Sequence, residues 1–248
     1  MKNFTADDLQ ANFSKLLSLV DEYIQEPRRS QLKRLYEDHA ERIIMMPASS
    51  IDHHHNAFTG GYVDHVIRVV NCSLSLMQLW ESMGAVVDYT KEELVFVALN
   101  HDLGKIGTEE AEQYIPNGSD WHRKNLGKLY EYNAVNPFMT VPDRSLFLLQ
   151  GRGIKLSMNE FFGIKLHDGL YEDSNKSYFI SHTQASKLRS NLPIIMHHAD
   201  HMAARIEYEK WAEQSTTKRA IKAEPATSSS ISQTEKDSLM SVFNDLFK

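Results

Sequence analysis

Apolar residues recur at helical spacing along most of the chain, which predicts a mainly α-helical body. Between residues 7 and 26 the recurring positions are Leu9, Phe13, Leu16, Leu17, Val20 and Ile24. The same spacing predicts helices over residues 30–45, 62–83, 90–103, 126–132, 144–151, 157–166 and 192–211. Thr90 and Glu93 form the capping pattern of a helix start. We therefore expect an all-α fold, a bundle of helices around one core.

Three segments of the body lack the helical pattern. Residues 47–61, PASSIDHHHNAFTGG, are rich in turn-forming residues and predict a loop, and residues 108–122 look irregular. Residues 167–182 fit a loop or a short hairpin, because Tyr171 and Tyr178 flank a polar turn. No series of alternating segments predicts a larger sheet.

The composition changes after Ala212, which predicts the end of the folded body. Residues 213–237 are polar and rich in Ser and Thr, as in a disordered linker, whereas residues 238–248, SLMSVFNDLFK, are apolar again. We expect one domain over residues 1–212, then the linker, then a short terminal helix.

The composition as a whole fits an intracellular protein. At 248 residues the chain is long enough for one full core, and no apolar run is long enough to span a bilayer. The first ten residues lack the apolar segment of a secretory signal, and the single cysteine, Cys72, fits a reducing compartment. The formal charge of −6 gives no overall attraction to nucleic acid, but it leaves room for a local basic cleft. We expect a cytoplasmic protein with no membrane partner.

Histidine and aspartate gather at the ends of the predicted core helices. His65 begins one helix, the His101-Asp102 pair ends the next, and His167-Asp168 follows another; the late helix contains HHADH, residues 197–201. Imidazole and carboxylate groups that meet between helices are typical of divalent metal sites in helical bundles. A random chain can contain one such pair, but this ordered set predicts metal binding.

The ordered set resembles the signature of the HD-domain metal-dependent phosphohydrolases. The pattern is His65, then His101-Asp102, then Asp200, within GGYVDHVIRVV, HDLGKIG and HHADHMAAR. The sequence is most similar to the HD half of bacterial 3′→5′ exoribonucleases that join an OB-fold to an HD domain, where a P-A-S, H-H, G-G stretch precedes the first ligand helix. The resemblance covers about residues 35–206 and implies an HD-type helical bundle. No OB-fold region is present.

The resemblance implies one or two divalent ions, Mn, Fe, Co, Ni, Mg or Zn. The first ion would be held by His65, His101, Asp102 and Asp200, and a second by His122 and His167 with Asp102 bridging. Two differences from the family pattern concern the ligands of the second ion. The segment WHRKNLG around His122 has one extra residue before its glycine, and His167-Asp168 stands where many relatives have a His-His pair. His197 and His198 are candidates for orienting the ligands.

The resemblance also implies phosphate-ester hydrolysis, with Asp102 and Lys105 as catalytic residues. Lys105 lies three residues beyond Asp102 and would steady a phosphate oxygen, although a lysine at a helix end can instead satisfy carbonyl groups. Basic residues gather in the middle of the chain, interleaved with aromatic ones: Arg123, Lys124, Lys128, Arg144, Arg152, Lys155 and Lys165, with Tyr130, Tyr132, Phe138 and Tyr171. Of these, we expect Arg123, Lys124 and Arg152 to bind substrate phosphates.

Three functions fit the sequence. The first is a phosphohydrolase acting on nucleic acid or nucleotides, specifically a 3′→5′ phosphodiesterase on single strands. The second is a nucleotidase or dNTP hydrolase, because the same site serves both reactions. The third is a non-catalytic adaptor that recruits a partner to replication or transcription machinery. All four signature ligands are present in the sequence, which favours catalysis over this third function.

The terminal peptide predicts a docking helix. Leu239, Phe243, Leu246 and Phe247 fall on one helical face, which suits a hydrophobic groove on another protein, although the peptide can also fold back onto its own domain. It resembles the Leu/Phe-rich tails by which tailed-phage polymerases and transcription factors hold a sliding clamp. That resemblance would suit a phage-encoded protein.

Overall fold

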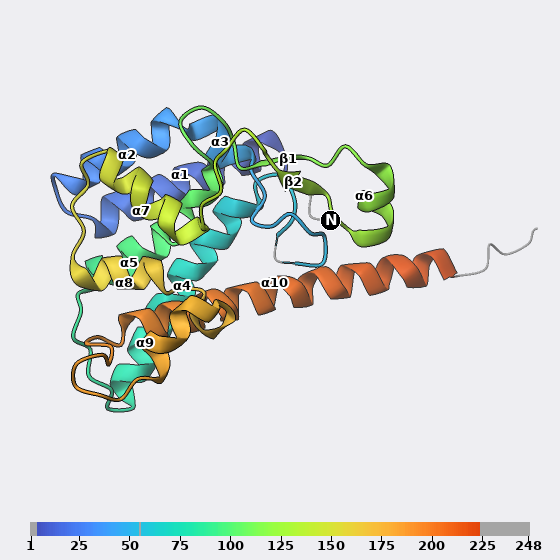
Figure 1. Ribbon diagram of the computed structural model, residues 1–248. Coiled ribbons are helices and arrows are strands. Elements are labelled where there is room, and N and C mark those ends of the chain that lie inside the picture. Colours follow the sequence, from blue (N-terminus) through green and yellow to red (C-terminus); the bar gives the residue numbers. More distant parts are fainter. Residues whose placement is uncertain (1–3, 55, 224–248) are drawn as a thin grey trace, which may run out of the picture. The chain divides into compact units, whose positions relative to one another are not determined.

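Ten α-helices and two short strands form the described part of the chain, residues 4–54 and 56–223, in the computed structural model (Figure 1). The helices are α1 (Ala6–Tyr23), α2 (Arg28–Asp38), α3 (Ala40–Met45), α4 (Gly61–Ser82), α5 (Lys91–Asn100), α6 (Asp120–Leu126), α7 (Val141–Gly151), α8 (Met158–Lys165), α9 (Lys176–Ile180) and α10 (Leu192–Ala223). Strands β1 (Tyr114–Pro116) and β2 (Tyr130–Tyr132) pair antiparallel, and three 3-10 helices are η1 (Leu103–Ile106), η2 (Gly169–Tyr171) and η3 (Asp173–Asn175). The prediction of an all-α fold is confirmed.

Helix α5 is the centre of the core. Every residue from Leu94 to Asn100 is buried, so this helix has no solvent-facing side beyond its first turn. It contacts α1, α4 and α8, and Figure 1 shows α4 and α5 side by side. Because the apolar run ends inside the core, the residues that follow it, His101 and Asp102, are buried as well.

Local signals fix where the principal helices begin. Thr90 accepts a hydrogen bond from the backbone of Glu93 while Glu93 bonds back to the backbone of Thr90, so the predicted capping box is confirmed. The same reciprocal pair opens α1 with Thr5 and Asp8, and α8 with Ser157 and Glu160. These caps satisfy amide groups that the first turn of a helix leaves without partners.

The start of α7 holds η1 in place behind the His-Asp pair. The backbone amide of Gly104 donates to Ser145 Oγ at 2.7 Å, and Ser145 Oγ donates to the carbonyl oxygen of His101 at 3.1 Å. A Cβ at position 104 would collide with the carbonyl oxygen of Val141, so this close approach requires glycine.

Several predicted elements are wrong in detail. The helix expected over residues 30–45 is divided at His39, whose backbone leaves the helical region. Residues 126–132, expected as a helix, lead into β2, and residues 108–122, expected as irregular, contain β1 and the start of α6. Three-residue strands give too short an alternation for a sequence signal, since their pairing depends on a partner elsewhere in the chain.

Two further segments are more helical than expected. Residues 167–182 form η2, η3 and α9 in place of a loop or hairpin. Helix α10 was expected to end at Trp211 but continues to Ala223, into the predicted linker. No Gly or Pro occurs between residues 211 and 223, so helix formers such as Ala, Lys and Arg outweigh the Ser and Thr residues there.

The chain divides into two compact units, residues 1–210 and residues 211–248. The domain boundary expected at residue 212 stays a prediction. The remainder of the predicted linker and the terminal peptide, residues 224–248, lie outside the described residues. None of the helices in the described part of the chain has the length and apolar character of a membrane-spanning helix.

Candidate metal centre

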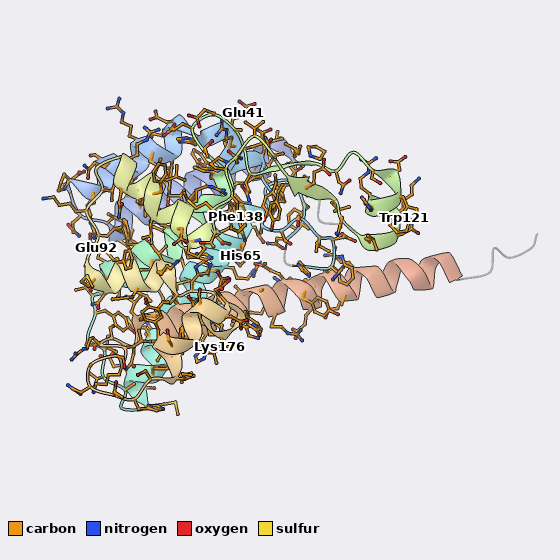
Figure 2. The ribbon with its side chains drawn as sticks, in the orientation of Figure 1. Glu41, His65, Glu92, Trp121, Phe138 and Lys176 are labelled. Carbon is orange, nitrogen blue, oxygen red and sulfur yellow. The ribbon has the colours of Figure 1, made fainter. Side chains whose placement is uncertain are left out.

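Five side chains from four parts of the chain converge at one buried point. His65 comes from α4, His101 and Asp102 from the end of α5, His167 from the end of α8 and Asp200 from α10. Asp200 Oδ1 lies 3.1 Å from His65 Nε2 and 3.9 Å from His101 Nε2. The oxygens of Asp102 lie 3.5 Å from His101 Nε2 and 3.7 Å from His65 and His167 Nε2. Figure 2 labels His65 among these core elements.

The ligand atoms form two overlapping groups that share one residue. His65, His101 and Asp102 form one group and His101, His167 and Asp200 the other, with the ligand atoms of each within 4.8 Å of one another. His101 has one nitrogen to offer, because its Nδ1 donates to the carbonyl oxygen of Ala98 at 2.8 Å. The two groups in the described part of the chain therefore form one cluster of five side chains that could hold a metal ion.

The environment of the His101 Nε2 atom is compatible with a metal ion where the five side chains meet. Its Nε2 is buried and has no hydrogen-bond partner among the described residues. A buried polar atom without a partner costs free energy, whereas a divalent ion accepts the lone pair of a neutral imidazole. His167 is oriented in the same way, since its Nδ1 donates to the carbonyl oxygen of Ile164 at 2.9 Å and Nε2 faces the centre.

Asp102 and Lys105 form a buried ion pair beside the centre. Lys105 Nζ lies 2.6 Å from Asp102 Oδ2, and both residues are buried. Burial alone would raise the pKa of Asp102, but the charge of Lys105 holds that pKa well below its ordinary value. Burial likewise acts to lower the pKa of Lys105, and Asp102 raises it above the usual value. Both groups are thus charged beside the candidate metal ligands.

Glu207 supports His65 from behind, and the sequence analysis missed it. Its oxygens lie 3.1 and 3.2 Å from His65 Nδ1, and Arg68 Nε donates to it at 3.0 Å. The carboxylate therefore fixes the ring so that Nε2 points at Asp200. A signal existed: Glu207 follows Asp200 by seven residues, two helical turns, and so lies on the same face of α10.

The charges around the centre keep two of its histidines protonated in the absence of metal. Burial disfavours a charged ring, but Glu207 and Asp200 raise the pKa of His65 to about 10. Asp168 and Asp102 similarly raise the pKa of His167 to about 9 against the effect of burial. Burial would raise the pKa of Asp200, but the hydrogen bond from His65 lowers it. The carboxylates are therefore ionised and ready to bind a cation.

The centre opens into a cleft of about 430 Å³. Asp102, Lys105, His167, Asp168 and Asp200 line it, together with Arg144 from α7 and with residues of the hairpin and the loop that follows: Gln113, Tyr114, Tyr132, Pro137, Phe138 and Met139. A molecule in this cleft would contact both the candidate metal ligands and two cationic side chains.

The other predicted site residues do not join this cleft. His122 is exposed on α6 and belongs to neither group of potential ligands in the described chain, and Figure 2 shows its neighbour Trp121 well away from His65. Arg123 pairs with Asp120 on the same helix, and Lys124 is exposed there. Arg152 pairs with Asp38 and Glu109.

The cleft selects a different arginine from the predicted basic set. Arg144 lines the cleft, whereas the three residues expected to bind phosphate do not: Arg123, Lys124 and Arg152. The sequence places all of these residues in one basic stretch, so chain proximity could not separate them; the packing of α7 against η1 does.

The two histidines expected to orient ligands behave differently. His197 Nδ1 donates to the carbonyl oxygen of His167 at 3.0 Å, and its ring covers Gly169, where a Cβ would collide with it. It therefore supports the turn that carries His167. His198 is exposed and contacts the ring of Trp80, with 5.9 Å between ring centroids, so it does not reach a ligand. The partner-binding residues Leu239, Phe243, Leu246 and Phe247 lie outside the described residues.

The fold and the site together define a helical protein with a buried His/Asp centre that can hold a metal ion. Comparisons with family models, with curated proteins and with solved structures return no match to this chain.

Proposed function

We propose that this protein is a metal-dependent phosphohydrolase of the HD-domain type, acting on phosphate esters of nucleic acid or nucleotides. The observation that carries the proposal is the environment of His101 Nε2. This atom is buried without a hydrogen-bond partner among the described residues, and four further potential ligands surround it at the floor of a cleft with two cationic side chains. The ordered ligand motif and its resemblance to HD-domain enzymes support the same assignment.

Each side chain has a specific task in this proposal. His65, His101, Asp102, His167 and Asp200 would hold Mn, Fe, Co, Ni, Mg or Zn, which when bound supplies a nucleophilic hydroxide from water and polarises a phosphoryl oxygen. Lys105 would contact a non-bridging phosphate oxygen, because its ammonium group is buried beside Asp102 at the cleft. Arg144, which lines the same cleft, would neutralise a second phosphate oxygen.

The preferred substrate is the 3′ end of a single strand, cleaved as a 3′→5′ phosphodiesterase. A nucleotidase or dNTP hydrolase is the second candidate, since a cleft of about 430 Å³ can hold one nucleotide. The described residues support one ion, and a second ion at His122 is not part of the proposal. Binding of a sliding clamp through residues 238–248 stays a prediction, as does a cytoplasmic location.

The test is hydrolysis by the purified full chain with each divalent metal in turn. Substrates are 5′-labelled single-stranded RNA and DNA, nucleoside monophosphates and dNTPs. We expect a ladder shortening from the 3′ end that disappears in EDTA and in Asp102→Asn. The matched control is Asp173→Asn, whose carboxylate is exposed on η3 and pairs only locally with Lys176. Phosphate release from mononucleotides alone would favour the second candidate, and no hydrolysis of any substrate with any metal would refute both.

A further inference from the structure

Part of the lining of the cleft that contains the candidate metal ligands is aromatic and exposed. Phe138 is 96% exposed and Tyr132 is 66% exposed, yet both line the same cleft as Asp102 and Lys105. Tyr132 stacks on Tyr114 across the hairpin, with ring centroids 5.6 Å apart and an angle of 24° between the planes. Two large aromatic side chains are thus exposed in the same cleft as the carboxylates and the two cations.

The loop that carries Phe138 is held by hydrogen bonds at the two residues that precede this side chain. The carbonyl oxygen of Pro137 accepts from Arg144 at 3.1 Å. Asn136 donates to the carbonyl oxygen of Glu112 at 2.8 Å and accepts from Thr108 Oγ1 at 2.8 Å. The backbone is therefore fixed while the neighbouring side chain stays in solvent. Exposed apolar side chains that gather at one cleft, unlike ones scattered singly, indicate a candidate ligand-binding surface.

The cations of the same cleft identify the kind of ligand. Arg144 is buried, and its three hydrogen bonds go to the neutral oxygens of Gly104, Gln113 and Pro137; it has no carboxylate partner in the part of the chain that the structure describes. A guanidinium group without an acidic partner is suited to a phosphate. A ligand that presents an anionic phosphate and a flat aromatic ring within one cleft is a nucleotide unit.

We infer that Tyr132 and Phe138 form a nucleobase-stacking wall, so the substrate is single-stranded nucleic acid, with the base beside the bound phosphate resting on these rings. The inference rests on the proposed function for the identity of the site. Stacking accepts every base, because each has a π-face, so this wall confers a requirement for a base without sequence preference. It also excludes paired strands, whose bases are already stacked on their neighbours.

The test measures binding without hydrolysis, so it does not depend on activity. Fluorescence anisotropy in EDTA compares the full chain with an oligothymidylate and with an abasic phosphodiester oligomer of equal length and charge. We expect Phe138→Ala and Tyr132→Ala each to weaken binding of the oligothymidylate by about five- to a hundredfold, with little change for the abasic oligomer. Phe138→Trp should restore binding. Phe147→Ala is the matched control, since Phe147 is 62% exposed on α7 and is not among the residues that line the cleft.

Three results would overturn the inference. The first is equal binding of the two oligomers by the unmodified chain, including no measurable binding of either. The second is unchanged binding of oligothymidylate in both alanine variants. The third is a dimer in size-exclusion chromatography that Phe138→Ala converts to monomer. The last result would make the rings a contact between copies. Hydrolysis of bis(p-nitrophenyl) phosphate, which carries no base, is measured in parallel. Failure of that hydrolysis together with an intact base preference would count against the proposed function alone.

Discussion

The buried carboxylate of Glu207 lies 3.1 Å from His65 Nδ1, while Asp200 lies 3.1 Å from Nε2 of the same ring. Both acids come from α10, so one helix fixes the two edges of a ring that belongs to α4. The orientation of His65 therefore depends on how these two helices pack. A candidate metal ligand held in this way keeps its Nε2 atom directed at the centre before any ion binds.

Replacing Glu207 should weaken metal binding although Glu207 is not itself a ligand. We expect Glu207→Gln to lower affinity for the bound divalent ion by about 10- to 100-fold, because the amide orients His65 less firmly and makes its nitrogen less basic. Competition with a chromogenic chelator measures the effect. Glu209→Gln, an exposed change on the same helix, is the control and should match the unmodified protein. Equal affinity in both variants would contradict the supporting role.

Replacing Lys105 should separate turnover from metal content. Lys105 pairs with Asp102 but lies outside both groups of potential ligands. We expect Lys105→Met to keep its metal, measured by elemental analysis, and to lose about 100-fold or more in turnover, because a buried cation no longer meets the developing phosphate charge. Lys155→Met, at an exposed position, serves as the control. Loss of metal in step with activity would instead make Lys105 a structural residue.

Metal affinity should rise with pH across the neutral range. The pKa values of about 10 for His65 and about 9 for His167 mean that both rings carry protons at neutral pH in the metal-free protein. Ligation needs neutral rings, so binding must release protons, and affinity should gain about tenfold per pH unit for each proton displaced, until the pH passes those values. Calorimetry in buffers of different ionisation enthalpy counts the protons. An affinity that stays flat from about pH 6 to 8, without proton release, would show that the rings are already neutral.

A pair of glycine substitutions tests how closely α8 packs on the central helix. A Cβ at Gly163 would approach Val97 Cγ2 to 2.8 Å and would collide with Leu192, whereas a Cβ at Gly151 meets nothing within 4 Å. We expect Gly163→Ala to lower the free energy of unfolding by about 1–3 kcal/mol through overpacking. Gly151→Ala should leave it unchanged or raise it by up to about 1 kcal/mol, since alanine favours a helix. Urea denaturation distinguishes the two, and equal stability of the variants would mean that α8 can move aside.

The sequence by itself determined the helical body and most of the candidate ligands. Apolar spacing predicted the core helices, the Thr90–Glu93 pattern predicted the start of α5, and the paired His and Asp residues predicted which helix ends meet. The helices and their starts follow from signals that act within one or two turns, so the order of residues along the chain is enough to predict them. The set of candidate ligands was predicted from its resemblance to the HD-domain pattern.

Only the tertiary structure decided which distant groups complete the site. Glu207 reaches His65 across 142 positions of sequence, Arg144 enters the cleft while Arg152 pairs with surface acids, and His122 remains exposed on α6. The two short strands that place Tyr132 opposite Tyr114 were not predicted from the sequence either. In each case the position of a side chain depends on how separate elements pack. That packing is set by the summed burial of many residues over the whole core, and no local pattern records it.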